Sequence, residues 1–143
     1  MGLLRLSQPT PEIGPEASVQ DAVRVMSDST VGAILITDAG RTAGIFTERD
    51  LMRRVVNQRL DPSKVIIKDV MTKPVQTVPD STSVAEAAAI MRKGQFRHLA
   101  IVDRNGQVLG MVALRYLLYD LLNELELKVD DLSGYLMADG PGG

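Results

Sequence analysis

Apolar and polar positions along the chain alternate between two spacings. The segment 18–28 carries apolar residues at helical spacing, and short apolar runs rich in β-branched residues occupy 33–37 and 43–46. Helical spacing predicts an amphipathic helix, and a short apolar run predicts a buried strand. Apolar residues return to helical spacing from 47 to about 58. We therefore expect a helix, two strands and a second helix, in that order.

The same series of patterns occurs a second time. Ser83 begins the second copy as Ser18 begins the first, and apolar runs follow at 99–102 and 108–113. A short strand is expected ahead of the first helix in each copy, at 75–78 in the second. Each copy has one apolar sheet face, which is buried when the two copies pack together. The expected fold is α+β with mixed α/β character: two pseudo-symmetric strand-helix-strand-strand-helix units packed sheet to sheet.

Proline and glycine mark the boundaries between the parts. An N-terminal arm interrupted by prolines, followed by the first unit, is expected over 1–60. A proline-containing linker covers 61–68 and the second unit covers 69–124. A C-terminal helix with a flexible tail is expected over 125–143, the tail beginning at Ala138.

The C-terminal segment carries an apolar seam whose spacing alternates between four and three residues. Its members are Leu118, Leu122, Leu125, Val129, Leu132 and Leu136. Such a seam is typical of coiled coils, although about two and a half heptads are fewer than coiled coils usually have. Two interpretations are open. The helix packs on its own domain, or it contributes to a dimer interface.

Composition narrows the classes of function. The 143 residues include no Cys, which excludes thiol chemistry, disulfides and Cys-ligated zinc. The net charge of −2 and the pI of about 5.4 indicate no basic surface for nucleic acid. No apolar run approaches the roughly 18 residues of a membrane span, and the first residues do not resemble a signal peptide. We expect a cytoplasmic protein with neither nucleic acid nor a membrane as partner.

The segment Gly44–Asp50 ends a strand and begins a helix. The free backbone N–H groups of a helix start, the Thr47 hydroxyl and the Asp50 carboxylate gather there, which suits a phosphorylated sugar. Thr47 and Asp50 also fit a capping box, in which each side chain bonds the backbone N–H of the other. Both interpretations are open.

Three segments of the chain resemble a known family. They are Gly44–Asp50, Asp69–Val75 and Phe96–Asp103. In this order, and within a tandem repeat, they resemble a pair of cystathionine-β-synthase (CBS) domains, or Bateman module, over roughly residues 8–122. The resemblance implies a stand-alone module with two pseudo-symmetric clefts, which dimerises into a flat disc. It also implies an adenosine-type ligand: AMP, ADP, ATP or, in some members, S-adenosylmethionine or a dinucleotide.

The resemblance assigns roles to four polar residues. It implies that Asp50 holds the ribose hydroxyls and Thr47 lies near the phosphate, which Arg97 and His98 reach from the second unit. A carboxylate accepts bonds from two adjacent hydroxyls, and a guanidinium matches phosphate oxygens. Histidine adds a protonation-dependent donor near pH 7. Without the resemblance, Arg97 and His98 would be a solvated strand end. Weaker candidates for a base pocket are Val31, Ile34, Ile45 and Phe46.

Three arginines follow on the helix that begins at this junction. Arg49, Arg53 and Arg54 are expected on a solvated helix face. Arg49 is close enough to the junction to reach a phosphate, but the solvated face is the favoured interpretation.

The second cleft lacks the polar set of the first. Its four matching positions are Gly32, Ala33, Ala113 and Tyr116. We therefore expect one competent nucleotide cleft per chain. The other cleft is expected to be empty or to hold something unlike a nucleotide, with the Tyr116 ring filling its space.

The leading hypothesis is a regulatory module that senses an adenine nucleotide or an adenosyl ligand, without a required cofactor, a metal or catalysis. We expect a homodimer that acts on an unknown client protein. The alternative is a ligand-free structural module for protein interaction or dimerisation. An enzyme is the weakest hypothesis, because the single His98 would have to serve any nucleophile, and no nucleophile elbow or P-loop occurs.

Overall fold

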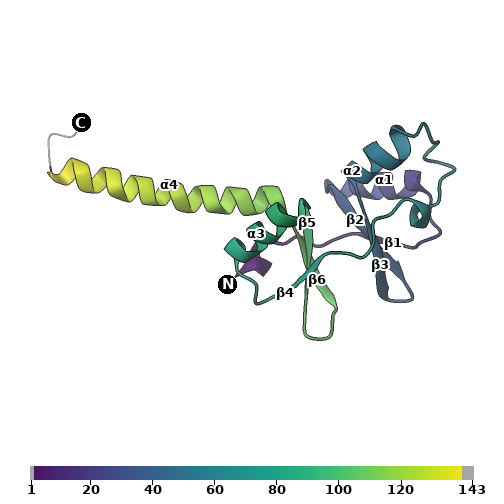
Figure 1. Cartoon of the computed structure of the whole chain (residues 1–143), viewed down its shortest axis with the longest axis horizontal. Coiled ribbons are helices and arrows are strands. Elements are labelled where there is room, and N and C mark those ends of the chain that lie inside the picture. Colours follow the sequence, from purple (N-terminus) through teal and green to yellow (C-terminus); the bar gives the residue numbers. More distant parts are fainter. Residues whose placement is uncertain (1, 140–143) are drawn as a thin grey trace.

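Two small three-stranded sheets face each other, and one long helix projects from the second of them (Figure 1). The computed structural model describes residues 2–139, with the side chains of residues 2–129. No helix within the described part of the chain is long and apolar enough to cross a membrane.

The first repeat begins with β1 (Glu12–Ile13) and α1 (Val19–Ser29). β2 (Ala33–Asp38) and β3 (Arg41–Thr47) follow, and then the short α2 (Glu48–Asp50). The sheet order is β1-β2-β3, with β1 parallel and β3 antiparallel to β2.

The second repeat has the same topology. It consists of β4 (Thr77–Pro79), α3 (Val84–Gly94), β5 (His98–Val102), β6 (Val108–Ala113) and α4 (Leu114–Asp139). Its sheet order is β4-β5-β6, again with one parallel and one antiparallel pair. The predicted pair of strand-helix-strand-strand-helix units is therefore confirmed.

The helix starts follow from their capping residues. Ser18 accepts a hydrogen bond from the Asp21 N–H at 3.0 Å, and Ser83 accepts one from Glu86 at the same distance. Each bond satisfies one of the backbone donors that a helix start leaves unpaired. The equivalent caps explain why α1 and α3 begin at matching points of the two repeats.

Each repeat has its own core between sheet and helices, and a third apolar cluster joins the two sheets. The joining cluster consists of Ala33, Leu35, Ile45, Ala100 and Met111, all at most 7% exposed. Successive strand residues face opposite sides of a sheet. Because these side chains point to the facing sheet, the two repeats bury their apolar faces against each other as predicted.

Segments that lie outside the two repeats pack into the cores of the repeats or pair with one of their strands. Leu3, from a short 3-10 turn at the N-terminus, is fully buried in the core of the second repeat. Ile67, from the linker, is fully buried in the core of the first repeat. In the structure the linker continues without a strand or an α-helix as far as β4, and within this continuation Thr72 pairs with Ile45 through two backbone hydrogen bonds of 2.7 and 2.9 Å.

Gly44 permits the close approach of that linker segment. A Cβ at position 44 would lie 2.9 Å from the Thr72 carbonyl oxygen and 2.6 Å from the Met71 sulfur. Gly110 has the same role in the second repeat, where a Cβ would lie 2.6 Å from the Ser7 hydroxyl. The glycines at these matching positions therefore let a neighbouring segment lie directly on the sheet.

Two elements differ from the sequence-based expectation. The helix expected from 47 to about 58 is α-helical only at its start and continues as a π-helical segment, Leu51–Val56. Its wider hydrogen bonds include Asn57 N–H to the Met52 carbonyl at 2.8 Å. The strand expected at 75–78 is shifted to Thr77–Pro79. Neither change is visible in apolar spacing, which differs little between α- and π-helical turns.

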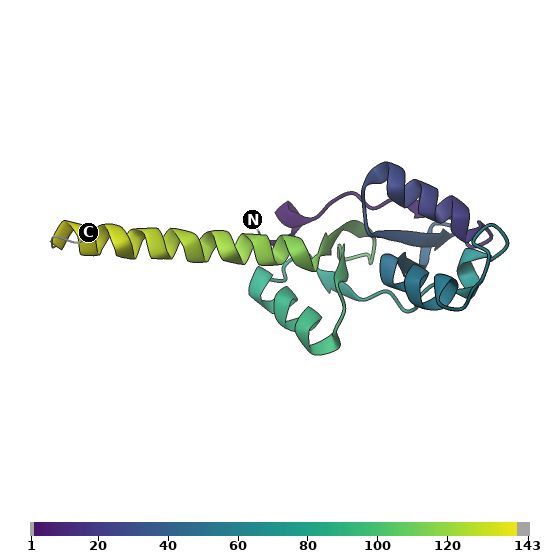
Figure 2. The same ribbon diagram turned by 90° about the horizontal axis from the view of Figure 1, so that it is seen from above.

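The long helix α4 is anchored only at its beginning. Leu117 is fully buried in the second-repeat core, whereas Leu118, Leu122, Leu125 and Val129 are 48–57% exposed. Figures 1 and 2 show the helix running away from both sheets. Packing on its own domain therefore accounts for the first turns of α4 and leaves the seam exposed. The flexible tail was expected from Ala138, but α4 reaches Asp139, and residues 140–143 lie outside the described part.

Candidate ligand site between the repeats

A cavity of about 350 Å³ opens between the two repeats. Its polar lining comes from the start of α2, from the linker and from the segment leading into β5. The polar and charged members are Thr47, Glu48, Arg49, Asp50, Thr72, Lys73, Gln76, Gln95, Arg97 and His98. The fold thus brings the four polar residues of the sequence hypothesis to one cavity.

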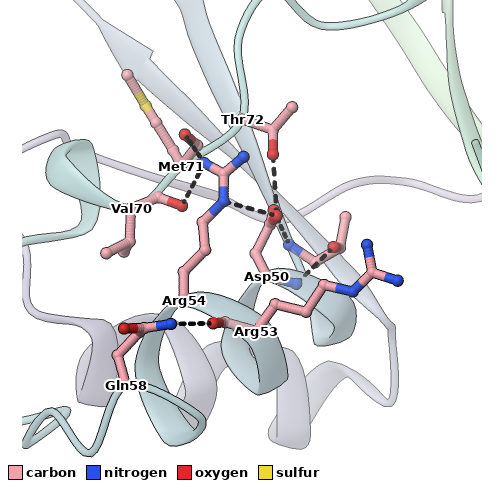
Figure 3. Close-up of polar contacts among 8 residues, drawn as sticks. Asp50, Arg53, Arg54, Gln58, Val70, Met71 and Thr72 are labelled. Carbon is pink, nitrogen blue, oxygen red and sulfur yellow. Dashed lines mark hydrogen bonds and ion pairs between the residues drawn. The ribbon is translucent and has the colours of Figure 1, made fainter.

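Asp50 is the most enclosed polar group of this cavity, with 8% of its surface exposed. One carboxylate oxygen accepts the Thr47 N–H at 3.1 Å, and the Thr47 hydroxyl accepts the Asp50 N–H at 3.2 Å. The capping box that the sequence allowed is therefore present. The other oxygen accepts the Thr72 hydroxyl at 2.9 Å (Figure 3).

These bonds do not exhaust the acceptor capacity of Asp50. A carboxylate has about four lone-pair sites, and two of them are used by Thr47 and Thr72. The remaining sites are available to hydroxyl donors that enter the cavity. Helix capping and ligand binding are thus compatible roles for one side chain.

Arg54, four residues further along the same helix face, also supports Asp50. Its Nη1 donates to the carbonyl oxygens of Met71 at 2.9 Å and Val70 at 3.2 Å, and its Nε lies 3.7 Å from Asp50 (Figure 3). Arg49 lines the cavity and donates to the Gln95 carbonyl at 3.4 Å. The expected solvated face holds for Arg53 and Arg54, whose side chains are exposed, and is wrong only for Arg49, which is half-buried because it lies against the second repeat.

His98 is a neutral imidazole at neutral pH in this environment. Burial, together with the positive charges of Arg115, Arg97 and Arg49, lowers the pKa of His98 from 6.5 to about 4. The expectation of a donor that changes protonation near pH 7 is corrected for the unliganded chain. A bound anion would offset the positive charges of the three arginines and so act to raise this pKa, although it would not relieve the burial. Arg97, in contrast, is exposed and carries its charge into the cavity mouth.

The weaker base-pocket candidates do not all line the same cavity, because successive strand residues face opposite sides of the sheet. Ile45 lines the cavity, but Phe46 and Ile34 are fully buried in the first-repeat core and line neither cavity. Phe46 pairs with Ile34 and faces the helices, whereas Ile45 faces the opposite sheet. Val31 lines a different cavity. Only Ile45 therefore remains a candidate for this site.

The sequence did not indicate five of the polar lining residues: Glu48, Thr72, Lys73, Gln76 and Gln95. Thr72 and Lys73 belong to the linker, and Gln95 precedes β5. Thr72 lies within Asp69–Val75, a segment on which the family resemblance rests, so the sequence could have indicated that Thr72 lies near the site. Its bond to Asp50 could not be predicted from the sequence, because the bond depends on the pairing of Thr72 with Ile45.

A second cavity of about 350 Å³ lies at the pseudo-symmetric position. The expected Gly32, Ala33, Ala113 and Tyr116 all line it. Tyr116 does not fill the space, contrary to the expectation, because its ring packs with neighbouring side chains. The Arg115 guanidinium carbon lies 5.0 Å from the ring centroid, and the Tyr119 ring packs against it edge to face.

The two cavities have a common wall. Gly32, Glu48, Arg97 and His98 line both of them, and Arg115 lines the second. The second cavity therefore has basic side chains, although it lacks a counterpart of Asp50. The four matching positions do not reproduce the polar set of the first cavity, but Arg97 and His98 border both spaces, which the sequence did not indicate.

Comparison with known proteins establishes the family. The family model of the CBS domain matches residues 6–57 and 67–123 of this chain. These two matches coincide with the two repeats and cover most of the sequence. The chain belongs to the CBS-domain family.

Among the relatives is an uncharacterised protein of Methanopyrus kandleri, 35% identical over 103 residues. The match covers 72% of this chain and 53% of the relative, so the chain spans about half of that relative's length. A CBS-domain-containing protein from Agrobacterium tumefaciens has a solved structure with 27% identity and a TM-score of 0.74, covering 84% of this chain and 98% of that chain.

One similar solved structure contains a nucleotide. It is a CBS domain protein from Pyrobaculum aerophilum complexed with AMP, with 26% identity and a TM-score of 0.76. The similarity covers 90% of this chain and 99% of that chain.

Proposed function

We propose that this chain is a regulatory module that binds an adenine nucleotide, or an adenosyl ligand such as S-adenosylmethionine, in the cavity containing Asp50. The observation that carries the proposal is the convergence of Thr47, Asp50, Arg97 and His98 on one cavity from two repeats. The AMP complex of the P. aerophilum relative supports the ligand class.

The chemistry of the lining suits a nucleoside phosphate. Asp50 retains acceptor sites for the two ribose hydroxyls, while Arg49, Lys73 and Arg97 supply positive charge for a phosphate. Ile45 offers an apolar wall for the base. A cavity of about 350 Å³ falls within the usual range of small-ligand sites, roughly 300 to 1,000 Å³.

Regulation follows from the position of the cavity between the repeats. A ligand that contacts α2 and β5 at once stabilises the arrangement in which these elements are correctly spaced. It shifts the conformational equilibrium only by its difference in affinity for the two arrangements. The proposed output is therefore a change in the relation of the two repeats, read by a client protein and not by catalysis within this chain.

Isothermal titration with AMP, ADP, ATP and S-adenosylmethionine tests the proposal. At least one ligand is expected to bind, with affinity reduced at least tenfold in Asp50→Asn. Asp21→Asn is the matched control, because Asp21 is an exposed acidic residue in the first turn of a helix remote from the cavity. The absence of binding by all four ligands, or equal binding by Asp50→Asn, would contradict the proposal.

A ligand-free interaction module is the second candidate. It is favoured by the exposed apolar side chains of α4 and by the internal hydrogen bonds of Asp50. Thermal unfolding with increasing AMP separates the candidates. A ligand at about one hundred times its Kd stabilises the folded chain by about 2.7 kcal/mol, whereas an interaction module shows no shift.

A further inference from the structure

The apolar face of α4 is incomplete within a single chain. Leu118, Leu122, Leu125 and Val129 follow the 4-3-4 spacing of a coiled-coil seam, and each is about half exposed. From this face we propose that α4 pairs in parallel with α4 of a second copy of this chain. The proposal is independent of the ligand proposed above.

The anchoring of α4 leaves the seam available. Leu117 is buried in the second-repeat core, and the Asp120 carboxylate is held by the Arg5 guanidinium at 3.0 and 3.1 Å. These contacts fix the direction in which the helix leaves the domain. Beyond them the helix runs outward (Figure 2), so the seam faces solvent over several turns.

A second copy fits this face because the seam complements itself. Leu118 and Leu125 occupy d positions, and Leu122 and Val129 occupy a positions. In a parallel pair, each of these residues meets its own counterpart. Leucine at d with a β-branched residue at a favours two strands, and Val129 meets this condition at one of the two a positions. A helix that packs against nothing is only marginally stable in water. Pairing with a second copy therefore also explains how a helix as long as α4 stays folded.

Charge at the flanking positions favours the parallel orientation. Glu126 occupies an e position and Lys128 a g position. In a centred antiparallel pair, Glu126 would meet Glu126 of the second copy, and Lys128 would meet Lys128. A parallel pair places e beside g and brings none of these like charges together.

The size of the contact sets its expected strength. The 26 residues of α4 span about 39 Å, and a helix is about 10 Å wide. Only the part from Leu118 onward, about 33 Å, is free of the domain, so the flat footprint is roughly 330 Å² per chain, or roughly 660 Å² for both, which is small for a specific interface. The dimer is therefore expected to form in a concentration-dependent manner.

Cysteine cross-linking tests the geometry directly, because the chain has no Cys of its own. Leu125→Cys is expected to form an intermolecular disulfide under mild oxidation, since d positions face each other in a parallel pair. Leu127→Cys is the matched control: Leu127 is 64% exposed, but it lies on the outer face of the seam. Equal cross-linking of the two variants, or none of Leu125→Cys, overturns the proposal.

Sedimentation equilibrium supplies the second readout. The native chain is expected to approach twice its 15.5 kDa mass as concentration rises. Leu122→Glu/Leu125→Glu is expected to remain monomeric, while Leu127→Glu associates as the native chain does. A native chain that stays monomeric throughout overturns the proposal, as does a double variant that still dimerises. Circular dichroism of the double variant checks that the repeats remain folded.

Discussion

The hydrogen bond from Thr72 to Asp50 joins the linker to the start of α2, and Thr72→Val removes it. Valine keeps the β-branched shape, and the two backbone bonds between Thr72 and Ile45 do not involve the hydroxyl. The variant therefore loses the 2.9 Å bond to the carboxylate and little else. Because Asp50 is 8% exposed, water replaces the lost donor poorly.

The magnitude follows from the charge on the acceptor. A hydrogen bond to a charged group contributes about 1.5–3 kcal/mol, so the free energy of unfolding should fall by about that amount. For a chain of this length the melting temperature should drop by roughly 5–10 °C. A less constrained carboxylate should also weaken AMP binding by roughly tenfold, equivalent to about 1.4 kcal/mol.

Urea unfolding and AMP titration of Thr72→Val measure both effects. Thr77→Val is the matched control, because Thr77 is an exposed threonine of β4 that does not line the cavity. A double-mutant cycle with Asp50→Asn isolates the coupling of the pair. Unchanged stability of Thr72→Val, or a coupling energy near zero, would refute the argument that the linker organises Asp50.

Three further predictions concern charge, protonation and close packing. Arg97→Ala should weaken AMP binding about tenfold in titration calorimetry, while Arg92→Ala, an exposed residue of α3, should not; equal affinities would contradict the role of Arg97. The pKa of His98 is lowered to about 4, so the stability supplied by its neutral form is present above pH 6.5 and lost toward pH 4. Urea unfolding should show a loss of about 2–3 kcal/mol over that range, absent in His98→Gln; identical pH profiles would contradict it. Gly44→Ala should lower the free energy of unfolding by about 1–3 kcal/mol through overpacking, and Gly14→Ala, where a Cβ meets nothing within 4 Å, should not; a neutral Gly44→Ala would contradict the close approach.

The fold was predictable because the spacing of apolar residues and the capping serines agree with each other. Ser18 and Ser83 begin α1 and α3 as expected, and the apolar run 108–113 is strand β6. The π-helical segment was not predictable, because its apolar spacing differs little from that of an α-helix. The seam of α4 was visible in the sequence, but its exposure became evident only from where Leu117 anchors the helix.

The site was predictable as far as the repeat defines it. Thr47, Asp50, Arg97 and His98 line one cavity because the end of β3 in the first repeat meets the start of β5 in the second. The orientation of apolar strand residues was not predictable, since Ile45 and Phe46 are both apolar and face opposite sides. Roles that depend on tertiary contact, such as the Thr72 hydroxyl bond, require the three-dimensional structure.

Native mass spectrometry of the chain mixed with AMP shows whether the cavity that contains Asp50 binds a nucleotide. We expect a complex with AMP, whose bound fraction falls sharply in Asp50→Asn and is unchanged in Asp21→Asn. A native chain that binds no AMP, or an Asp50→Asn variant that retains the full bound fraction, would contradict nucleotide binding at Asp50.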